Sequence, residues 1–277
     1  MRRRFIQVDV FGVATFRGNP LAVVVDGDGL SDDEMQQFAN WTNLSETTFI
    51  VPTTRPDADY QVRIFTAATE LPFAGHPTLG TCHAWLEAGG VPLDPGTIVQ
   101  ECGVGLVRVR PSGGRLAFAA PPLIRSGPAE PEVISEVVEQ LGIHSDDIVA
   151  CEWVDNGPGW LGVLLESAEA VLAARPLPTG RLKLGLIGAY EPGSAVEFEV
   201  RGLFPSPDGV VFEDPVTGSL NASLAQWLLR TGRATSPYVA QQGTVIGRNG
   251  RVYIEQIGTD IWVAGNTMSC ITGHVDI

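Results

Sequence analysis

The stretch "GHPTLGTCHAWLEAGG", residues 75–90, places a histidine directly before a proline and then continues as an apolar helix pattern. Proline is tolerated at the first helical position because its missing N–H would have no partner there, so we expect a helix that begins at Pro77. The pair Gly89-Gly90 predicts its end. A strand-like "YQVRIFT" precedes this helix, and "LVRVRPSGGRLAFAAPP" follows it as a hairpin that turns at Gly113-Gly114.

A second copy of this unit is found when the sequence is shifted by 138 residues, half of the 277-residue chain. The shift brings similar residues into register: Val62, Arg63, Pro77, Gly80 and Thr81 fall on Val200, Arg201, Pro215, Gly218 and Ser219. The strand "AVEFEVRGLF", the helix "DPVTGSLNASLAQWLLRTG" and the hairpin "GTVIGRNGRVYIEQI", turning at Asn249-Gly250, then repeat the order of the first unit.

The repeat predicts an α+β protein of two pseudo-symmetric domains, each a mostly antiparallel or mixed sheet wrapped around a central helix. We expect residues 1–123 to form the first domain, completed by a C-terminal strand at 264–277, and residues 124–263 to form the second. The linker falls near "PPLIRSGPAEP". A further helix, "SDDEMQQFANWT", is expected in the first domain with Ser31 as its N-cap.

Composition restricts the partners. The chain is 44% hydrophobic and 18% charged with a net charge of −14, which is globular and argues against nucleic acid, since phosphate binding needs clustered Lys and Arg. No apolar stretch approaches the ~20 residues that span a bilayer, and the basic run Arg2-Arg3-Arg4 leads into a strand rather than a signal peptide. Four scattered cysteines without metal-site spacing suit a reducing cytoplasm. We expect a cytoplasmic protein that binds a small anionic molecule.

The two central helices start with polar residues beside glycines. Helix N-termini present unpaired N–H groups and partial positive charge, so they favour anions. His76 and Asp214 precede the two prolines, and the polar residues and glycines near them are Gly75, Gly80, Thr81, Gly218 and Ser219. Asp before Pro is also simply a good helix cap, and a histidine there can be a packed side chain. The occurrence of both motifs at matching places favours a substrate carboxylate held between two similar halves.

Two further motifs lie near strand starts. Glu46, in "NLSETTFI", lies between a helix and a strand, where partial burial would make a carboxyl useful for moving protons near neutral pH. Asn19, in "GNPLAVVV", precedes a proline and is either a turn former or a ligand contact. Either residue alone is more often structural than functional.

Taken together, "GNPLAVVV", "TNLSETTFI", "RIFTAATELPFAGHPTLGT", "FEDPVTGSLNASLAQWL" and "QQGTVIGRNGRV" closely resemble the phenazine-biosynthesis PhzF-like isomerase family. The likeness runs from Phe5 to about Ile254 with the motifs in family order. It implies a diaminopimelate epimerase-like fold, with Glu46 as the catalytic proton carrier and with His76 and Asp214 assisting proton transfer and orientation. The implied substrate contacts are Asn19, Ser45, Gly75, Gly80, Thr81, Gly218 and Ser219.

The same resemblance implies the chemistry. Epimerase relatives carry two cysteines at the paired helix starts, where this chain has Gly75 and Asp214, so two-cysteine racemisation is not expected. The family implies a homodimer and isomerisation without a metal or organic cofactor, and its founding members act on trans-2,3-dihydro-3-hydroxyanthranilate. The open alternatives are an epimerase or dehydratase-type lyase acting on a hydroxy or amino acid, and a small-carboxylate binding protein without turnover. A metal hydrolase is disfavoured because the four histidines lack ligand spacing.

Overall fold

A computed structural model describes residues 1–206 and 208–277, which divide into two compact units. The first unit is Met1–Ala119 with Ala264–Ile277, and the second is Ala120–Val263. The sequence predicts a boundary after residue 123, and the division falls after Ala119. Part of the expected linker is ordered as strand β9 (Arg125–Pro128), which pairs with β10 (Ile148–Asp155).

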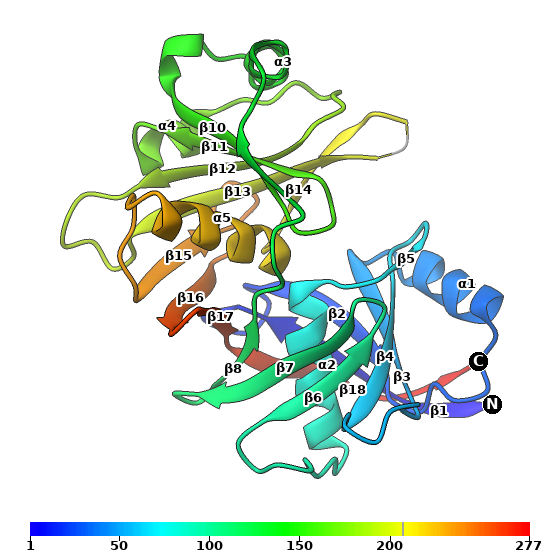
Figure 1. Cartoon of the computed structure of the whole chain (residues 1–277). Helices are drawn as coiled ribbons and strands as arrows, with labels where there is room; N and C mark the ends of the chain where they lie inside the picture. The colour runs from blue at the N-terminus through cyan, green and yellow to red at the C-terminus, as the bar shows by residue number, and fades with distance from the viewer. Residues whose placement is uncertain (207) are drawn as a thin grey trace. The chain divides into compact units, whose positions relative to one another are not determined.

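The first unit is a sheet that surrounds one helix. Its elements are β1 (Arg2–Val10), β2 (Asn19–Val24), α1 (Asp32–Thr42), β3 (Glu46–Val51), β4 (Tyr60–Phe65), β5 (Glu70–Leu71), α2 (Gly75–Glu87), β6 (Ile98–Cys102), β7 (Gly105–Ser112), β8 (Arg115–Ala119) and β18 (Thr267–Asp276). The strands pair in the order β18-β1-β2-β3-β4-β6-β7-β8, with β5 also on β4; β2–β3 and β4–β6 are parallel and the other pairs antiparallel. Helix α2 contacts strands from both ends of this sheet (Figure 1), and the two chain ends lie side by side because β1 pairs with β18.

Local sequence explains the helices of this unit. Ser31 is the N-cap of α1 as predicted: its hydroxyl accepts from the N–H of Glu34, whose carboxylate accepts from the N–H of Ser31 at 2.8 Å. The predicted start of α2 at Pro77 is wrong. The helix begins at Gly75 with Ala74 as N-cap, which places Pro77 third in the helix, where its missing N–H still needs no partner. The hairpin between β7 and β8 turns at Gly113-Gly114 as predicted.

The second unit repeats this plan. Besides β9 and β10 its elements are α3 (Pro131–Leu141), the short 3₁₀ helix η1 (Ser145–Asp147), β11 (Trp160–Leu165), α4 (Ala168–Ala173), β12 (Lys183–Ala189), β13 (Phe198–Pro205), β14 (Val211–Asp214), α5 (Gly218–Arg230), β15 (Tyr238–Gln242) and β16 (Gly250–Ile257), followed by β17 (Asp260–Gly265). The strands pair in the order β9-β10-β11-β12-β13-β15-β16, with β14 also on β13. Helix α5 packs against β10, β11 and β16 (Figure 1).

Two predicted details of the second unit are wrong. The segment 214–217 is not helical: α5 begins at Gly218 with Thr217 as N-cap, so Asp214 ends a strand. The hairpin does not turn at Asn249-Gly250, because Gly250 is already the first residue of β16. The chain instead turns through residues 243–249, a loop closed by a hydrogen bond from the N–H of Arg248 to the carbonyl of Gly243 at 2.8 Å.

The strand pairing shows which residues of the two units are equivalent. In the first unit Ile64 is opposite Leu71, and in the second Gly202 is opposite Asp214. The 138-residue shift therefore holds in β4 and β13. It fails beyond them, because Asp214 follows Gly202 by 12 residues whereas Leu71 follows Ile64 by 7. Asp214 is equivalent to Leu71, and Ser219, the second residue of α5, is equivalent to His76, the second residue of α2.

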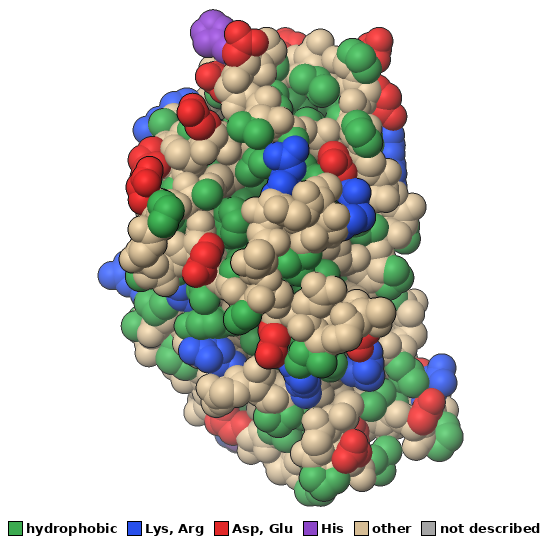
Figure 2. All heavy atoms as spheres, turned by 60° about the vertical axis from the view of Figure 1, so that its left-hand side comes forward, with side chains coloured by type: hydrophobic (Ala, Val, Ile, Leu, Met, Phe, Trp, Pro, Cys, Tyr) green, Lys and Arg blue, Asp and Glu red, His purple; other side chains and the backbone are tan. Residues whose placement is uncertain are grey.

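The surface is mixed in charge despite the net charge of −14. On the face drawn in Figure 2, acidic and basic side chains are interspersed with apolar and neutral ones. Among the described residues, no helix is both long enough and apolar enough to cross a membrane. Single charges of both signs spread in this way keep a surface hydrated.

Candidate active site

Three polar side chains of the first unit meet at the start of α2. Asn19 opens β2 and Glu46 opens β3, and since these neighbouring strands are parallel, both residues lie at the same end of the sheet. His76 reaches this end from the first turn of α2. Its Nδ1 lies 3.4 Å from Oε2 of Glu46 and 3.4 Å from Nδ2 of Asn19. The structure thus places together three residues that the sequence predicts for the site.

The imidazole of His76 is held in its neutral form. His76 is only 3% exposed, and this burial lowers its pKa to about 3. A contact with the Pro20 carbonyl raises the pKa, but by less. At neutral pH the Glu46 contact is therefore one between a carboxyl group and an uncharged ring rather than an ion pair. Within the described residues, Nε2 of His76 makes no hydrogen bond, so this nitrogen is available to a ligand.

The other predicted residues of the first unit divide into two groups. Ser45 directly precedes Glu46 and is half-buried, and Gly75 is the first residue of α2. Gly80 and Thr81 lie deeper in the helix. The hydroxyl of Thr81 donates to Thr48 at 2.8 Å, and a Cβ on Gly80 would lie only 2.6 Å from Leu21, so these two residues serve the packing of α2 on the sheet. We therefore leave Gly80 and Thr81 out of the substrate contacts proposed below.

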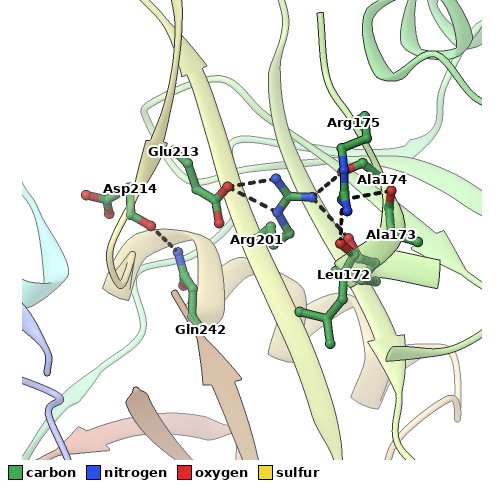
Figure 3. Close-up of polar contacts among 9 residues, drawn as sticks. Leu172, Ala173, Ala174, Arg175, Arg201, Glu213, Asp214 and Gln242 are labelled. Carbon is green, nitrogen blue, oxygen red and sulfur yellow. Dashed lines mark hydrogen bonds and ion pairs between the residues drawn. The ribbon is translucent and has the colours of Figure 1, made fainter. Parts of the chain in front are cut away.

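Asp214 belongs to a second polar group, in the second unit, and Figure 3 draws its hydrogen bond with Gln242. It is 7% exposed and ends β14, and its Oδ2 accepts a hydrogen bond from the hydroxyl of Thr217 at 2.6 Å. Nε2 of Gln242 donates to that hydroxyl at 2.9 Å and to the Asp214 carbonyl at 3.2 Å. Because Gln242 is a donor to the Thr217 oxygen, the hydroxyl proton is directed to Asp214.

The start of α5 presents hydrogen-bond donors. Gly218 and Ser219 are its first two residues and both are buried. The Ser219 hydroxyl accepts from the indole N–H of Trp160 at 3.2 Å, and the Ser219 carbonyl accepts from Asn156 at 3.0 Å. Among the described residues nothing accepts the Ser219 hydroxyl proton, so that proton can be donated to an anion at the helix start.

Sequence reasoning missed Thr217, Gln242, Asn156 and Trp160. Thr217 follows Asp214 by three residues, a spacing typical of side-chain caps, and this signal was available in the sequence. Gln242 lies in the family-like "QQG" motif, but only the parallel pairing of β13 with β15 brings it to Asp214. Nothing in the sequence marks Asn156, which follows β10, or Trp160, which is the first residue of β11.

Neither a metal-binding cluster nor a cysteine is found at the helix starts among the described residues. Among the described residues, no cluster of three or more His, Cys, Asp or Glu side chains could hold a metal ion. Cys82, Cys102 and Cys151 are buried, and Cys270 is half-buried on β18. The residues that precede α2 and α5 are Ala74 and Thr217. Gly75 and Asp214 are therefore not equivalent positions, which corrects the sequence-based comparison with the two-cysteine enzymes.

Comparisons with known proteins show the family of the chain. A family model described as "Phenazine biosynthesis-like protein" matches residues 8–273. Antisense-enhancing sequence 1 of Schizosaccharomyces pombe is 35% identical, covering 97% of each chain. The trans-2,3-dihydro-3-hydroxyanthranilate isomerase of Pseudomonas aeruginosa is 34% identical, covering 97% of this chain and 94% of its own. A crystal structure of a PhzF-family phenazine biosynthesis protein from Enterococcus faecalis covers 100% of both chains with a TM-score of 0.79 and 26% identity.

Proposed function

Because the chain belongs to the phenazine biosynthesis-like protein family, we propose that it moves a proton within a small unsaturated carboxylic or amino acid without a cofactor. The names of its relatives and the shared fold support an isomerase. We assign the proton-carrying role to Glu46. The observation that carries this assignment is its carboxyl group 3.4 Å from the neutral imidazole of His76, at the start of the central helix.

A carboxyl beside a neutral imidazole suits reversible proton transfer. Glu46 removes a proton from an acidic C–H of the substrate and returns it to another carbon, and the net result is an allylic isomerisation. His76 has one ring nitrogen directed at Glu46 and Asn19, and its Nε2 can contact the substrate. We propose that Asn19 orients the ring and that Ser45 and Gly75 line the same site.

In this proposal the second unit provides hydrogen-bond donors for the negatively charged group of the substrate. The first residues of α5, Gly218 and Ser219, bind the substrate carboxylate through helix N–H groups and the Ser219 hydroxyl. Asp214 orients a polar group of the substrate or receives a proton from it. Its support is the hydrogen bond from the Thr217 hydroxyl, which fixes one oxygen of the Asp214 carboxylate.

The proposed substrate is supported by a relative whose name states its reaction. We propose trans-2,3-dihydro-3-hydroxyanthranilate or a similar small unsaturated amino acid, because the chain is 34% identical to an isomerase named for that compound. An epimerase, a dehydratase-type lyase or a binding protein without turnover are the alternatives. The first two use the same base but differ in where the proton or leaving group goes.

Deuterium incorporation tests the function. The protein is incubated in D₂O with trans-2,3-dihydro-3-hydroxyanthranilate and, separately, with a panel of small unsaturated and hydroxylated amino acids, and the products are analysed by NMR. Label at a new carbon indicates isomerisation, label at the original carbon with inversion indicates epimerisation, and loss of water indicates a lyase. Absence of label and of product in every compound would contradict the proposed enzyme.

Glu46→Gln tests the proton carrier. The amide keeps the size of the side chain but cannot exchange a proton, so we expect turnover to fall by about 10²–10⁴-fold, the usual contribution of general acid–base catalysis. Glu139→Gln, at an exposed position of α3, is the matched control and is expected to keep wild-type turnover. If Glu46→Gln turns over as the wild type does, the role of Glu46 is wrong.

A further inference from the structure

The strand that ends at Asp214 carries a buried ion pair on its other face. Successive residues of a strand point to opposite faces, so Glu213 points away from the side chain of Asp214. Oε2 of Glu213 accepts from Nη2 of Arg201 on β13 at 2.7 Å and from Nε at 3.2 Å (Figure 3). The two side chains are only 4% and 9% exposed, so the pair is shielded from solvent.

The same guanidinium also binds the end of α4. Its Nη1 donates to the carbonyl of Ala174 at 2.8 Å and to that of Val171 at 3.1 Å. These carbonyls belong to the C-terminal turn of the helix, where the partial negative charge of the backbone favours a cation. Arg201 therefore connects three elements, β13, β14 and α4, through one planar group.

Because the Arg201–Glu213 ion pair is buried, its geometry is restricted. If the partner of a buried charge moves away, the charge is left unpaired and without water, which costs free energy. The pair therefore keeps one geometry. Glu213 is fixed in this way on one face of β14. The next residue is held as well, because Nε2 of Gln242 donates to the carbonyl of Asp214. Each of the last two residues of β14 is thus held by a side-chain contact.

The first unit contains an equivalent Arg–Glu pair, but no acidic residue stands at the position equivalent to Asp214. Arg63 on β4 binds Glu70 on β5 at 2.7 Å, and the residue after Glu70 is Leu71, the equivalent of Asp214. There the carboxylate side chain is 42% exposed. The arrangement is thus common to both repeats, and it is buried in the repeat whose next residue carries a carboxylate.

We propose that Arg201 and Glu213 are positioning residues that fix the carboxylate of Asp214 for the reaction. This inference rests on the role of Asp214 in the proposed function. Neither residue needs to touch the substrate: Glu213 determines where β14 ends, and Asp214 follows it directly. Loss of the pair lets the end of β14 shift, which displaces Asp214 and its hydrogen bond from Thr217.

The test replaces the pair by apolar side chains of similar length, Arg201→Met with Glu213→Met, because removing one partner alone leaves a buried charge and endangers folding. We expect kcat on the substrate found by deuterium labelling to fall by about 10-fold to 100-fold, the size of effect that a small displacement of a reacting group produces, with KM little changed. The matched control is Arg63→Met with Glu70→Met, the equivalent but more exposed pair, which is expected to keep wild-type kcat.

Two readouts separate positioning from a general structural effect. In an Asp214→Asn background, the Met pair should cause no further loss of kcat, whereas independent effects would multiply. Hydrogen exchange of the Thr217 amide, bonded to Gln242 at 3.0 Å, should become at least about tenfold faster, while amides of β11 and β12 keep their rates.

The outcomes distinguish the two proposals. Wild-type exchange at Thr217 in the Met pair would overturn the positioning role whatever the turnover, and so would an undiminished loss of kcat in the Asp214→Asn background. If Asp214→Asn alone keeps wild-type turnover, the role of Asp214 in the proposed function is wrong, and exchange at Thr217 alone then decides whether the pair fixes this strand end.

Discussion

Replacing His76 by glutamine should reduce the loss of stability that the protein suffers in acid. Burial lowers the pKa of His76 from 6.5 to about 3, so between these values the unfolded chain binds a proton that the folded protein excludes. The stability that this neutral histidine provides is therefore complete above pH 6.5 and declines as the pH falls towards 3. Each pKa unit corresponds to about 1.4 kcal/mol, which gives about 2 kcal/mol lost at about pH 5.

The assay is urea denaturation of the wild type and His76→Gln at pH 7.5 and at pH 5. The free energy of unfolding should drop between these pH values by about 2 kcal/mol less in the variant, because glutamine does not titrate. His274→Gln, at an exposed position, should behave as the wild type does. An identical pH dependence in His76→Gln and the wild type would refute the reasoning and would mean that the Glu46 carboxylate, 3.4 Å away, compensates the burial of a charged ring.

Two other substitutions test the second unit. A Cβ on Gly202 would lie 2.7 Å from the Thr217 hydroxyl, so Gly202→Ala should lower the free energy of unfolding by about 1–3 kcal/mol and reduce turnover. Gly273→Ala is the control, because a Cβ at Gly273 would meet no atom within 4 Å. Equal stability of the two variants would contradict the steric argument. Glu199 is fully buried, and burial raises its pKa, so the stability that its protonated form provides is lost as the pH rises from about 4.5 through the raised value. Glu199→Gln should therefore be more stable than the wild type at pH 7.5 and lose that advantage at pH 4 in urea denaturation, and a constant difference would exclude titration of Glu199.

The repeated plan could be predicted from the sequence because it depends on local signals. Alternating apolar residues predict β4 and β13, and the serine before three acidic residues predicts the start of α1. The family-like motifs around Glu46 and His76 mark residues that the fold brings within 3.4 Å. These features are encoded within a few residues of each other, so tertiary contacts have little opportunity to change them.

The helix starts and the Asp214 contacts could not be predicted in the same way. Proline is compatible with the first several positions of a helix, so Pro77 alone does not distinguish a start at Gly75 from its own position. The contacts of Asp214 depend on strand pairing: Gln242 comes from a strand parallel to β13, and Arg201 reaches the end of α4. A constant shift ignores the longer β13–β14 hairpin and matches His76 with Asp214, whereas the strand pairing matches His76 with Ser219.

This corrected equivalence bears on the reaction. A racemase that uses matched bases at its two helix starts needs an acid or base at both equivalent places. Here the residues that precede the helices are Ala74 and Thr217, and the second helical residues are His76 and Ser219, so only one of the two helix starts carries an imidazole. The carboxyl groups come from strands instead, Glu46 from the start of β3 and Asp214 from the end of β14, which are not equivalent positions in the repeat. If Glu46 and Asp214 act as we propose, the acidic groups are unequal in the two repeats. Such a set suits a proton that leaves and returns at chemically different carbons better than a two-base inversion.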